Sequence, residues 1–133
     1  MKDLAKKILH YFDDKPHIVS ITLFGSYAKN TAVDTSDVDI AILCEKSHIP
    51  NSLTLMTWKE DISTLVHKDV DLICLNTSSP MIGMQVYKNG KDLVIKNARE
   101  HANYQMLLFS EYAELKELRA PMEKNILKRK YYD

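Results

Sequence analysis

The sequence FGSYAKNTAVDTSDVD, residues 24–39, decides the fold, because it joins two apolar runs through a glycine turn and an acidic segment. The flanking runs, residues 18–24 and 40–44, are rich in β-branched side chains and short enough to be strands. The loop between them is long enough to bring the second strand back beside the first, and an antiparallel pair is the simplest result. We therefore predict a strand, a glycine turn and a returning strand.

Gly25 and Ser26 have the features of a phosphate-binding turn. Gly25 has no Cβ, so the chain can turn sharply there and a phosphate can come close to the backbone. Ser26 offers a hydroxyl and a backbone N–H at the predicted first turn of a short helix, the helix end that attracts anions. A lone Gly-Ser pair is usually only a turn, so this half of a nucleotide site depends on the acids that follow.

Asp37 and Asp39 supply the acidic half of the predicted site. Because they lie two residues apart on a strand, their side chains point to the same face. Paired carboxylates suit Mg²⁺ or Mn²⁺, and Mg²⁺ typically takes one or two carboxylates together with substrate phosphates. A lone Asp-x-Asp segment is more often a solvated strand end, but next to the glycine turn it favours a metal and nucleotide site.

A third acidic strand strengthens this prediction. Residues 69–75 repeat the order acid, apolar, acid and then apolar to the end. If this strand neighbours the second one, Asp71 reaches the first two carboxylates, whereas Asp69 is equally consistent with a solvated acid. Two carboxylates about 4 Å apart repel by roughly 4 kcal/mol at an effective dielectric of about 20. Such a cluster therefore indicates a cation that offsets the repulsion.

The remaining pattern predicts helices around a sheet. Helical spacing of apolar residues and a short apolar run predict helices over residues 3–12, 53–67, 80–89 and 98–119 and a last strand over residues 92–96. We expect Pro121 to end the long helix, which a basic and aromatic tail follows. The pattern thus predicts an α/β fold class, with about four strands flanked by helices, plus a long C-terminal helix. Residues 1–97 form the core, and residues 98–133 form the helix and tail of the same single domain.

Two of these helices carry more detailed predictions. A serine caps the helix that begins at Pro80, and Gly90 ends it as a residue that tolerates positive φ. The residues expected to face inward from this helix are Met81, Met84 and Tyr87. The apolar stripe expected on the long helix comprises Tyr104, Leu107, Leu108, Tyr112, Leu115 and Leu118.

Composition restricts the classes of function. The 133 residues include 18 basic and 18 acidic side chains, so no overall field attracts the chain to nucleic acid or membrane, and direct nucleic-acid binding is not expected. No apolar run has the length of a membrane span, and we expect a cytoplasmic protein. Cys44 and Cys74 each end an apolar strand and are expected as reduced core thiols. The histidines have no zinc-site spacing and are expected as ordinary surface or core residues; they are His10, His17, His48, His67 and His101.

These residues resemble a known signature: Gly-Ser, a gap of ten residues, Asp-x-Asp, and a later Asp that opens another strand. That pattern is similar to the DNA polymerase beta-like nucleotidyltransferase superfamily. The length, and the short helix, glycine and strand after the third Asp, look like the minimal nucleotidyltransferases, the MNT antitoxins encoded beside HEPN-domain toxins. The resemblance covers residues 1–97 well and the C-terminal helix only in general character.

The resemblance implies a nucleotidyltransferase (polymerase beta-like) fold, which is a mixed sheet flanked by helices, and a two-metal site. By this resemblance, Asp37 and Asp39 would ligate both Mg²⁺ ions, and Asp71 would ligate the catalytic ion and help to deprotonate the attacking hydroxyl. Gly25 and Ser26 would hold the triphosphate of ATP. The family often has Arg-Gly where this chain has Lys29 and Asn30. Lys29 can still hold a phosphate as a point charge, although an exposed lysine is equally consistent.

The resemblance also implies a function. MNT antitoxins transfer AMP from ATP to a tyrosine of their HEPN ribonuclease toxin and so neutralise it, which implies a hetero-oligomer with the toxin. One alternative is a non-catalytic antitoxin that blocks the toxin by occlusion. Another is a nucleotidyltransferase that acts on a small molecule or RNA, for which the chain would need an enclosing pocket.

Overall fold

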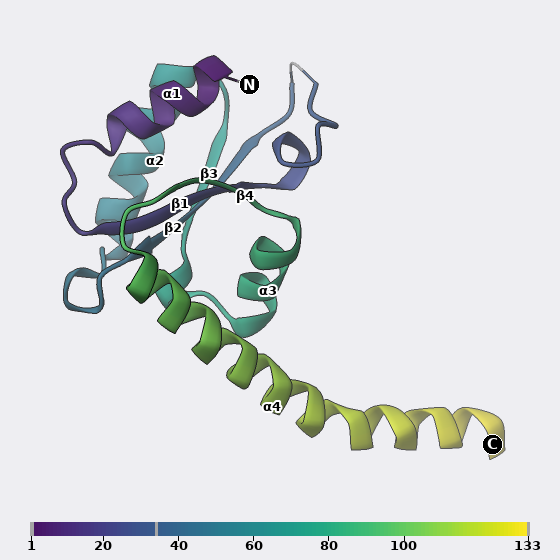
Figure 1. Cartoon of the computed structure of the whole chain (residues 1–133). Coiled ribbons are helices and arrows are strands. Elements are labelled where there is room, and N and C mark those ends of the chain that lie inside the picture. Colours follow the sequence, from purple (N-terminus) through teal and green to yellow (C-terminus); the bar gives the residue numbers. More distant parts are fainter. Residues whose placement is uncertain (1, 34, 133) are drawn as a thin grey trace.

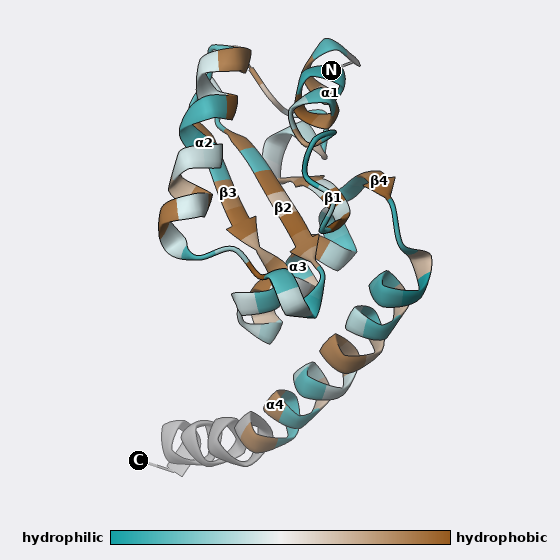
Figure 2. Ribbon diagram, turned by 90° about the vertical axis from the view of Figure 1, so that its left-hand side faces the viewer, coloured by the Kyte–Doolittle hydropathy of each residue, from teal (hydrophilic) through white to brown (hydrophobic). Residues whose placement is uncertain are grey.

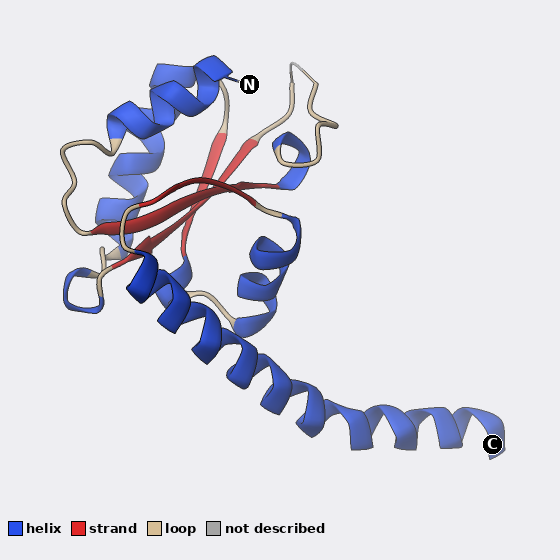
Figure 3. Ribbon diagram, in the orientation of Figure 1, coloured by secondary structure: helices blue, strands red, loops and turns tan. Residues whose placement is uncertain are grey.

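The computed structural model describes the backbone of residues 2–33 and 35–132 and the side chains of residues 3–33 and 35–118. The elements are α1 (Lys2–Tyr11), β1 (Ile18–Phe24), the 3-10 turn η1 (Gly25–Tyr27), β2 (Val38–Cys44), the 3-10 turn η2 (Lys46–His48), α2 (Ser52–Val66), β3 (Val70–Cys74), the 3-10 turn η3 (Leu75–Thr77), α3 (Pro80–Asn89), β4 (Lys91–Ile95) and α4 (Ala98–Tyr132). Figure 1 shows their arrangement, and Figure 3 separates the helices from the strands.

The four strands form one mixed sheet in the order β3-β2-β1-β4. β1 pairs antiparallel with both β2 and β4, whereas β2 and β3 are parallel. The parallel pair requires a crossover, and α2 supplies it. The predicted mixed sheet of about four strands and the predicted antiparallel pairing of the first two strands are confirmed.

Helices cover both faces of the sheet because the strands alternate apolar side chains between two cores. Ile40 and Ile42 of β2 face the larger core, to which α1 and α2 contribute. Ala41 and Leu43 of the same strand face the smaller core, which includes Val86 of α3. The apolar strands lie between more polar helices (Figure 2). Cys44 and Cys74 are buried free thiols, as predicted.

The inward face of α3 was predicted wrongly. Met81 and Tyr87 are 42% and 50% exposed, and Gly83 and Val86 are the buried residues of this helix. A Cβ at Gly83 would meet Leu108 Cδ1 of α4 at 2.7 Å, so the glycine face is the one that admits α4. Close approach of the two helices therefore outweighs the apolar character of the methionines.

Gly90 was predicted to end α3 because it tolerates positive φ, and this reason was also wrong. Ser79 caps α3 by accepting a hydrogen bond from the Ile82 N–H, as the sequence indicates, but Gly90 has an extended φ of −80°. A Cβ at Gly90 would lie 2.3 Å from the Val86 carbonyl oxygen and 2.6 Å from Thr22 Cγ2. Glycine is needed there for space and not for backbone conformation.

The long helix departs from its predicted end and stripe. α4 runs to Tyr132, so Pro121 does not end it. Proline removes one backbone N–H donor, and the turns on either side keep their own hydrogen bonds. Of the predicted stripe, Leu108 is buried, and the half-buried residues are Tyr104, Tyr112 and Leu115. Leu107 and Leu118 are 52% and 73% exposed, so the prediction was wrong for these two. The far part of α4 extends away from the sheet (Figure 1). The side chains of the basic tail lie outside the described residues.

We expect Gly90→Ala to lower the free energy of unfolding by about 1–3 kcal/mol, the usual cost of forcing an extra carbon into a filled site. The new Cβ would contact the Val86 carbonyl and Thr22, and neither can move without shifting a strand or a helix. Urea unfolding measures the change. Asn89→Ala, on the exposed end of the same helix, is the matched control and should leave stability nearly unchanged. Equal stability of both variants would contradict the steric explanation.

Candidate active site

Two predicted acids meet at the start of the parallel strands. Asp39 of β2 is the register partner of Asp71 of β3, so the two strands present them side by side. The Val38 N–H donates to the Asp69 carbonyl oxygen at 2.9 Å, which fixes this register. Asp37 lies just before β2 and is exposed, as Asp69 and Asp71 are. The prediction that the second and third strands are neighbours in the sheet is therefore confirmed.

Electrostatics link the three carboxylates. Burial raises the pKa of the Asp39 carboxyl above its usual value, and the negative charges of Asp71 and Asp37 raise it further. Burial disfavours the charged form of a carboxyl, and nearby like charges do the same. The acids thus form a patch of concentrated negative charge around a half-buried carboxylate.

The glycine turn lies directly against this patch. Phe24, the last residue of β1, pairs with Asp39. Gly25 follows with a φ of +69°, and a Cβ at that position would lie 2.1 Å from Asp39 Oδ2. The carboxylate therefore occupies the space that any other residue's Cβ would need. This contact gives a reason for Gly25 that sequence reasoning missed, in addition to the predicted approach of a phosphate.

The remaining predicted phosphate ligands lie in and after η1. Ser26 is half-buried, and its carbonyl oxygen accepts a hydrogen bond from the Thr31 N–H at 3.0 Å, which closes the loop behind the turn. Lys29 is exposed at the end of the turn. Gly25 thus lies against Asp39 with Ser26 as the next residue of the turn, and Lys29 is exposed beyond the turn.

A cleft opens in front of the acids, between the strand ends and α2. The residues that line it include the acids Asp37, Asp39, Asp69 and Asp71 and three residues of α2, namely Lys59, Glu60 and Ser63. Sequence reasoning missed the contribution of α2. Lys59 and Ser63 are four residues apart and so share a helix face, which was the available signal. Lys59 adds a positive charge to a cleft that is otherwise acidic.

Oxygen donors from separate elements suit Mg²⁺ or Mn²⁺. Burial and the charges of Asp71 and Asp37 both raise the pKa of Asp39, and a bound cation would offset both effects. The aspartates do not converge into a compact ligand set, however. Within the described side chains, the group of three possible ligands whose ligand atoms all lie within 4.8 Å of one another is His17, Glu45 and His48.

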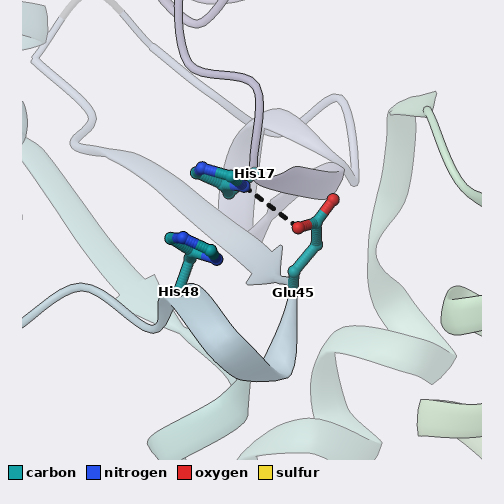
Figure 4. A group of neighbouring side chains, drawn as sticks. All are labelled: His17, Glu45 and His48. Atoms are coloured by element: carbon teal, nitrogen blue, oxygen red, sulfur yellow. Dashed lines mark hydrogen bonds and ion pairs between the residues drawn. The ribbon is translucent and has the colours of Figure 1, made fainter.

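Two of the histidines lie close together in the fold although they are far apart in the sequence. His17 and His48 lie with Glu45 (Figure 4) where β1 begins and β2 ends, whereas the acids lie where β2 begins. Their spacing in the sequence gives no zinc-like pattern, because antiparallel strands bring them together.

Comparison with known families agrees with this geometry. Residues 6–99 match the family model described as polymerase beta, nucleotidyltransferase. The chain belongs to this nucleotidyltransferase family. The match includes the glycine turn and all three predicted acids, and the nucleotidyltransferase fold expected from the sequence is confirmed.

The chain is similar to a protein adenylyltransferase and to a solved toxin-antitoxin structure. Protein adenylyltransferase MntA of Shewanella oneidensis is 32% identical over 81 residues, which are 61% of this chain and 57% of that protein. The alignment thus spans little more than half the length of that relative. A crystal structure of a toxin-antitoxin with AMP-PNP matches with a TM-score of 0.81 and 26% identity over 92% of this chain and 98% of that chain.

A further nucleotidyltransferase structure supports the fold alone. It contains the tri-AMPylated HEPN toxin of Shewanella oneidensis in complex with MNT antitoxin. The match has a TM-score of 0.77 and 24% identity, and it covers 95% of this chain and 98% of that chain.

None of the helices in the described part of the chain has the length and apolar character that a bilayer span needs.

We expect Asp39→Asn to stabilise the folded nucleotidyltransferase at pH 7 in the absence of divalent metal. The raised pKa means that the folded state disfavours the charged carboxylate. This cost is present above the folded-state pKa and disappears below the unfolded value of about 3.9. The stability gain of the variant should therefore vanish as the pH falls through this window.

Urea unfolding at pH 7 and at low pH measures this difference. Asp13→Asn, at an exposed position after α1, is the matched control and should show no such pH-dependent gain. A loss of stability in Asp39→Asn at pH 7 would show that the acid patch is not under electrostatic strain.

Proposed function

We propose that this nucleotidyltransferase is an antitoxin that transfers AMP from ATP to a tyrosine of a cognate HEPN ribonuclease toxin and so neutralises it. One observation carries the proposal: the Gly25 turn contacts Asp39, so the predicted phosphate-binding and acidic halves adjoin. The similarity to a protein adenylyltransferase and to a toxin-antitoxin with AMP-PNP supports the nucleotide and the class of partner.

In this proposal the acidic patch would hold a pair of Mg²⁺ ions. Asp37 and Asp39 would hold both ions, and Asp71 would hold the one nearer the acceptor. Bound there, the metal would neutralise charge on the phosphates and on the attacking and leaving oxygens. Mn²⁺ has the same preference for oxygen ligands and could replace Mg²⁺.

The protein groups divide the remaining work. Gly25 and Ser26 would orient the triphosphate from backbone and hydroxyl donors, with the exposed Lys29 as a further positive charge. Asp71 would accept the proton of the acceptor hydroxyl. The tyrosine oxygen then bonds to the α-phosphorus while the bond from that phosphorus to the bridging oxygen breaks, and pyrophosphate leaves.

The shape of the site favours a protein acceptor. Asp37 and Asp71, which line the cleft, are exposed, and the other described residues that line it come from strand ends and α2. Small-molecule sites typically enclose most of the ligand surface, and this cleft does not. A tyrosine presented by a partner surface could reach the acids, in a hetero-oligomer with the toxin. We place this reaction in the cytoplasm, where ATP is present and buried thiols such as Cys44 stay reduced.

We expect the purified protein with ATP and Mg²⁺ to increase the mass of a co-purified HEPN toxin by whole AMP units. Asp39→Asn should leave the toxin unlabelled, and Asp71→Asn should slow labelling by at least about 100-fold, the usual contribution of a general base. Intact-mass spectrometry over time measures both. Asp13→Asn, remote from the cleft, should label at the wild-type rate. Absence of labelling with the wild-type protein would overturn the proposal.

Neutralisation and labelling can be separated. If transfer neutralises the toxin, the double variant Asp37→Ala/Asp39→Ala should no longer protect cells that express the toxin, even when it still binds the toxin. Co-purification measures the binding, and growth measures the protection. Full protection by an inactive variant at equal dose would instead favour occlusion.

A further inference from the structure

A compact group of three side chains lies at the end of the sheet opposite to the acidic cleft. His17 immediately precedes β1, Glu45 immediately follows β2, and His48 ends the turn η2. Backbone hydrogen bonds fix these positions: the Glu45 N–H donates to the His17 carbonyl, and the His48 N–H donates to the Glu45 carbonyl, each at 2.9 Å. The sheet register therefore holds three potential metal ligands on a rigid frame.

The side chains are already turned toward one another (Figure 4). His17 Nδ1 lies 3.0 Å from Glu45 Oε2. The His17 and His48 rings are stacked, with centroids 3.5 Å apart and planes inclined by 6°. The Ser47 hydroxyl lies 2.8 Å from His48 Nδ1, which leaves Nε2 of that ring as the nitrogen available for a ligand. All three residues offer ligand atoms within 4.8 Å of one another.

We infer that His17, Glu45 and His48 bind a divalent transition-metal ion, with zinc as the best match. Two imidazoles and one carboxylate are a common ligand set of zinc sites that keep a fourth position open. Zn–N and Zn–O bonds of roughly 2.0–2.2 Å place the ligand atoms of a tetrahedral site about 3.3–3.6 Å apart. The three groups therefore need to approach by little more than about 1 Å, which a small rotation of each side chain provides.

The surroundings permit this rotation. The His17 and Glu45 side chains are 44% and 34% exposed, so they can move without disturbing the core. Nearby charged groups include Lys46, which begins η2, and Asp14 and Lys15, which line the same hollow. Lys15 Nζ lies 3.0 Å from Asp14 Oδ1 and 4.0 Å from the centroid of the Tyr11 ring, so its charge is partly neutralised. Glu45 supplies the negative charge that a divalent ion needs.

The ligand chemistry distinguishes this site from the acidic cleft. Imidazole nitrogens favour zinc and other transition metals, whereas carboxylate oxygens alone favour Mg²⁺ and Mn²⁺. A metal at His17 and His48 would tie the start of β1 to the turn after β2. Its open position faces a hollow that Ile49, Pro50 and Trp58 help to line. The two sites therefore take different ions, and loss of one should not remove the other.

Titration of the untagged, chelator-treated full chain with ZnCl₂, followed by calorimetry, tests the inference. We expect one tight site in the wild-type protein that excess Mg²⁺ does not displace. His17→Gln and His48→Gln should each weaken binding at least tenfold, and CoCl₂ should give the visible absorption of a four-coordinate ion only in the wild type. His10→Gln, at a His-carboxylate pair without a second histidine, is the matched control.

Two measurements keep the test decisive. Thermal unfolding in chelator should give the same midpoint for the wild type and the histidine variants, and added Zn²⁺ should raise the midpoint of the wild type but not of His17→Gln/His48→Gln. Asp39→Asn should retain the zinc site, which separates it from the acidic cleft. Absence of binding at millimolar Zn²⁺, or equal binding by the wild type and the double histidine variant, would overturn the inference.

Discussion

The parallel pairing of β2 with β3 is the constraint on which the candidate active site depends. Side chains alternate between the two faces of a sheet, so a shift of one residue in this register would send Asp71 to the face opposite Asp39. The buried residues of β2 prevent the shift, since Ile40 and Ile42 would exchange cores with Ala41 and Leu43. The apolar alternation that builds two cores thus also aligns two acids at the strand ends. The pairing register of β2 and β3 that stabilises the two cores is therefore also the one that places Asp39 beside Asp71.

Local sequence patterns predicted the strands and the antiparallel pairing of the first two, and the family resemblance implied the mixed sheet. Each of these depends on residues close in sequence: β-branched runs, a glycine turn, and a serine before Pro80. Predictions failed where contacts between distant elements decide the outcome. The buried face of α3 is set by Gly83 because α4 lies against it, and no periodicity within α3 reveals that neighbour. The requirement for glycine at position 90 likewise comes from the close approach of Thr22 of β1. The helical course past Pro121 depends on the turns around it and not on proline alone.

The two candidate sites also differ in how far local sequence could predict them. The acids and the Gly-Ser turn lie within a short segment, so their spacing could be read directly, and Asp71 followed from a repeated strand pattern. His17 and His48 are separated by two strands, and only the antiparallel register brings them together. A signal was nevertheless present, because His17 precedes the first strand and Glu45 follows the second. Residues that flank an antiparallel pair in this way meet at one end of it. Roles in chemistry, by contrast, stay predictions for every residue named.

The contact between Gly25 and Asp39 couples two positions in evolution. While the carboxylate is present, no other residue fits at position 25, because its Cβ would overlap an oxygen. If a descendant replaced the acid by alanine, only the backbone requirement of φ +69° would remain, and asparagine can satisfy it. Loss of the acid should thus come first and loss of the glycine second. A homologue with a larger residue at this turn would identify itself as one in which the acid has already been replaced.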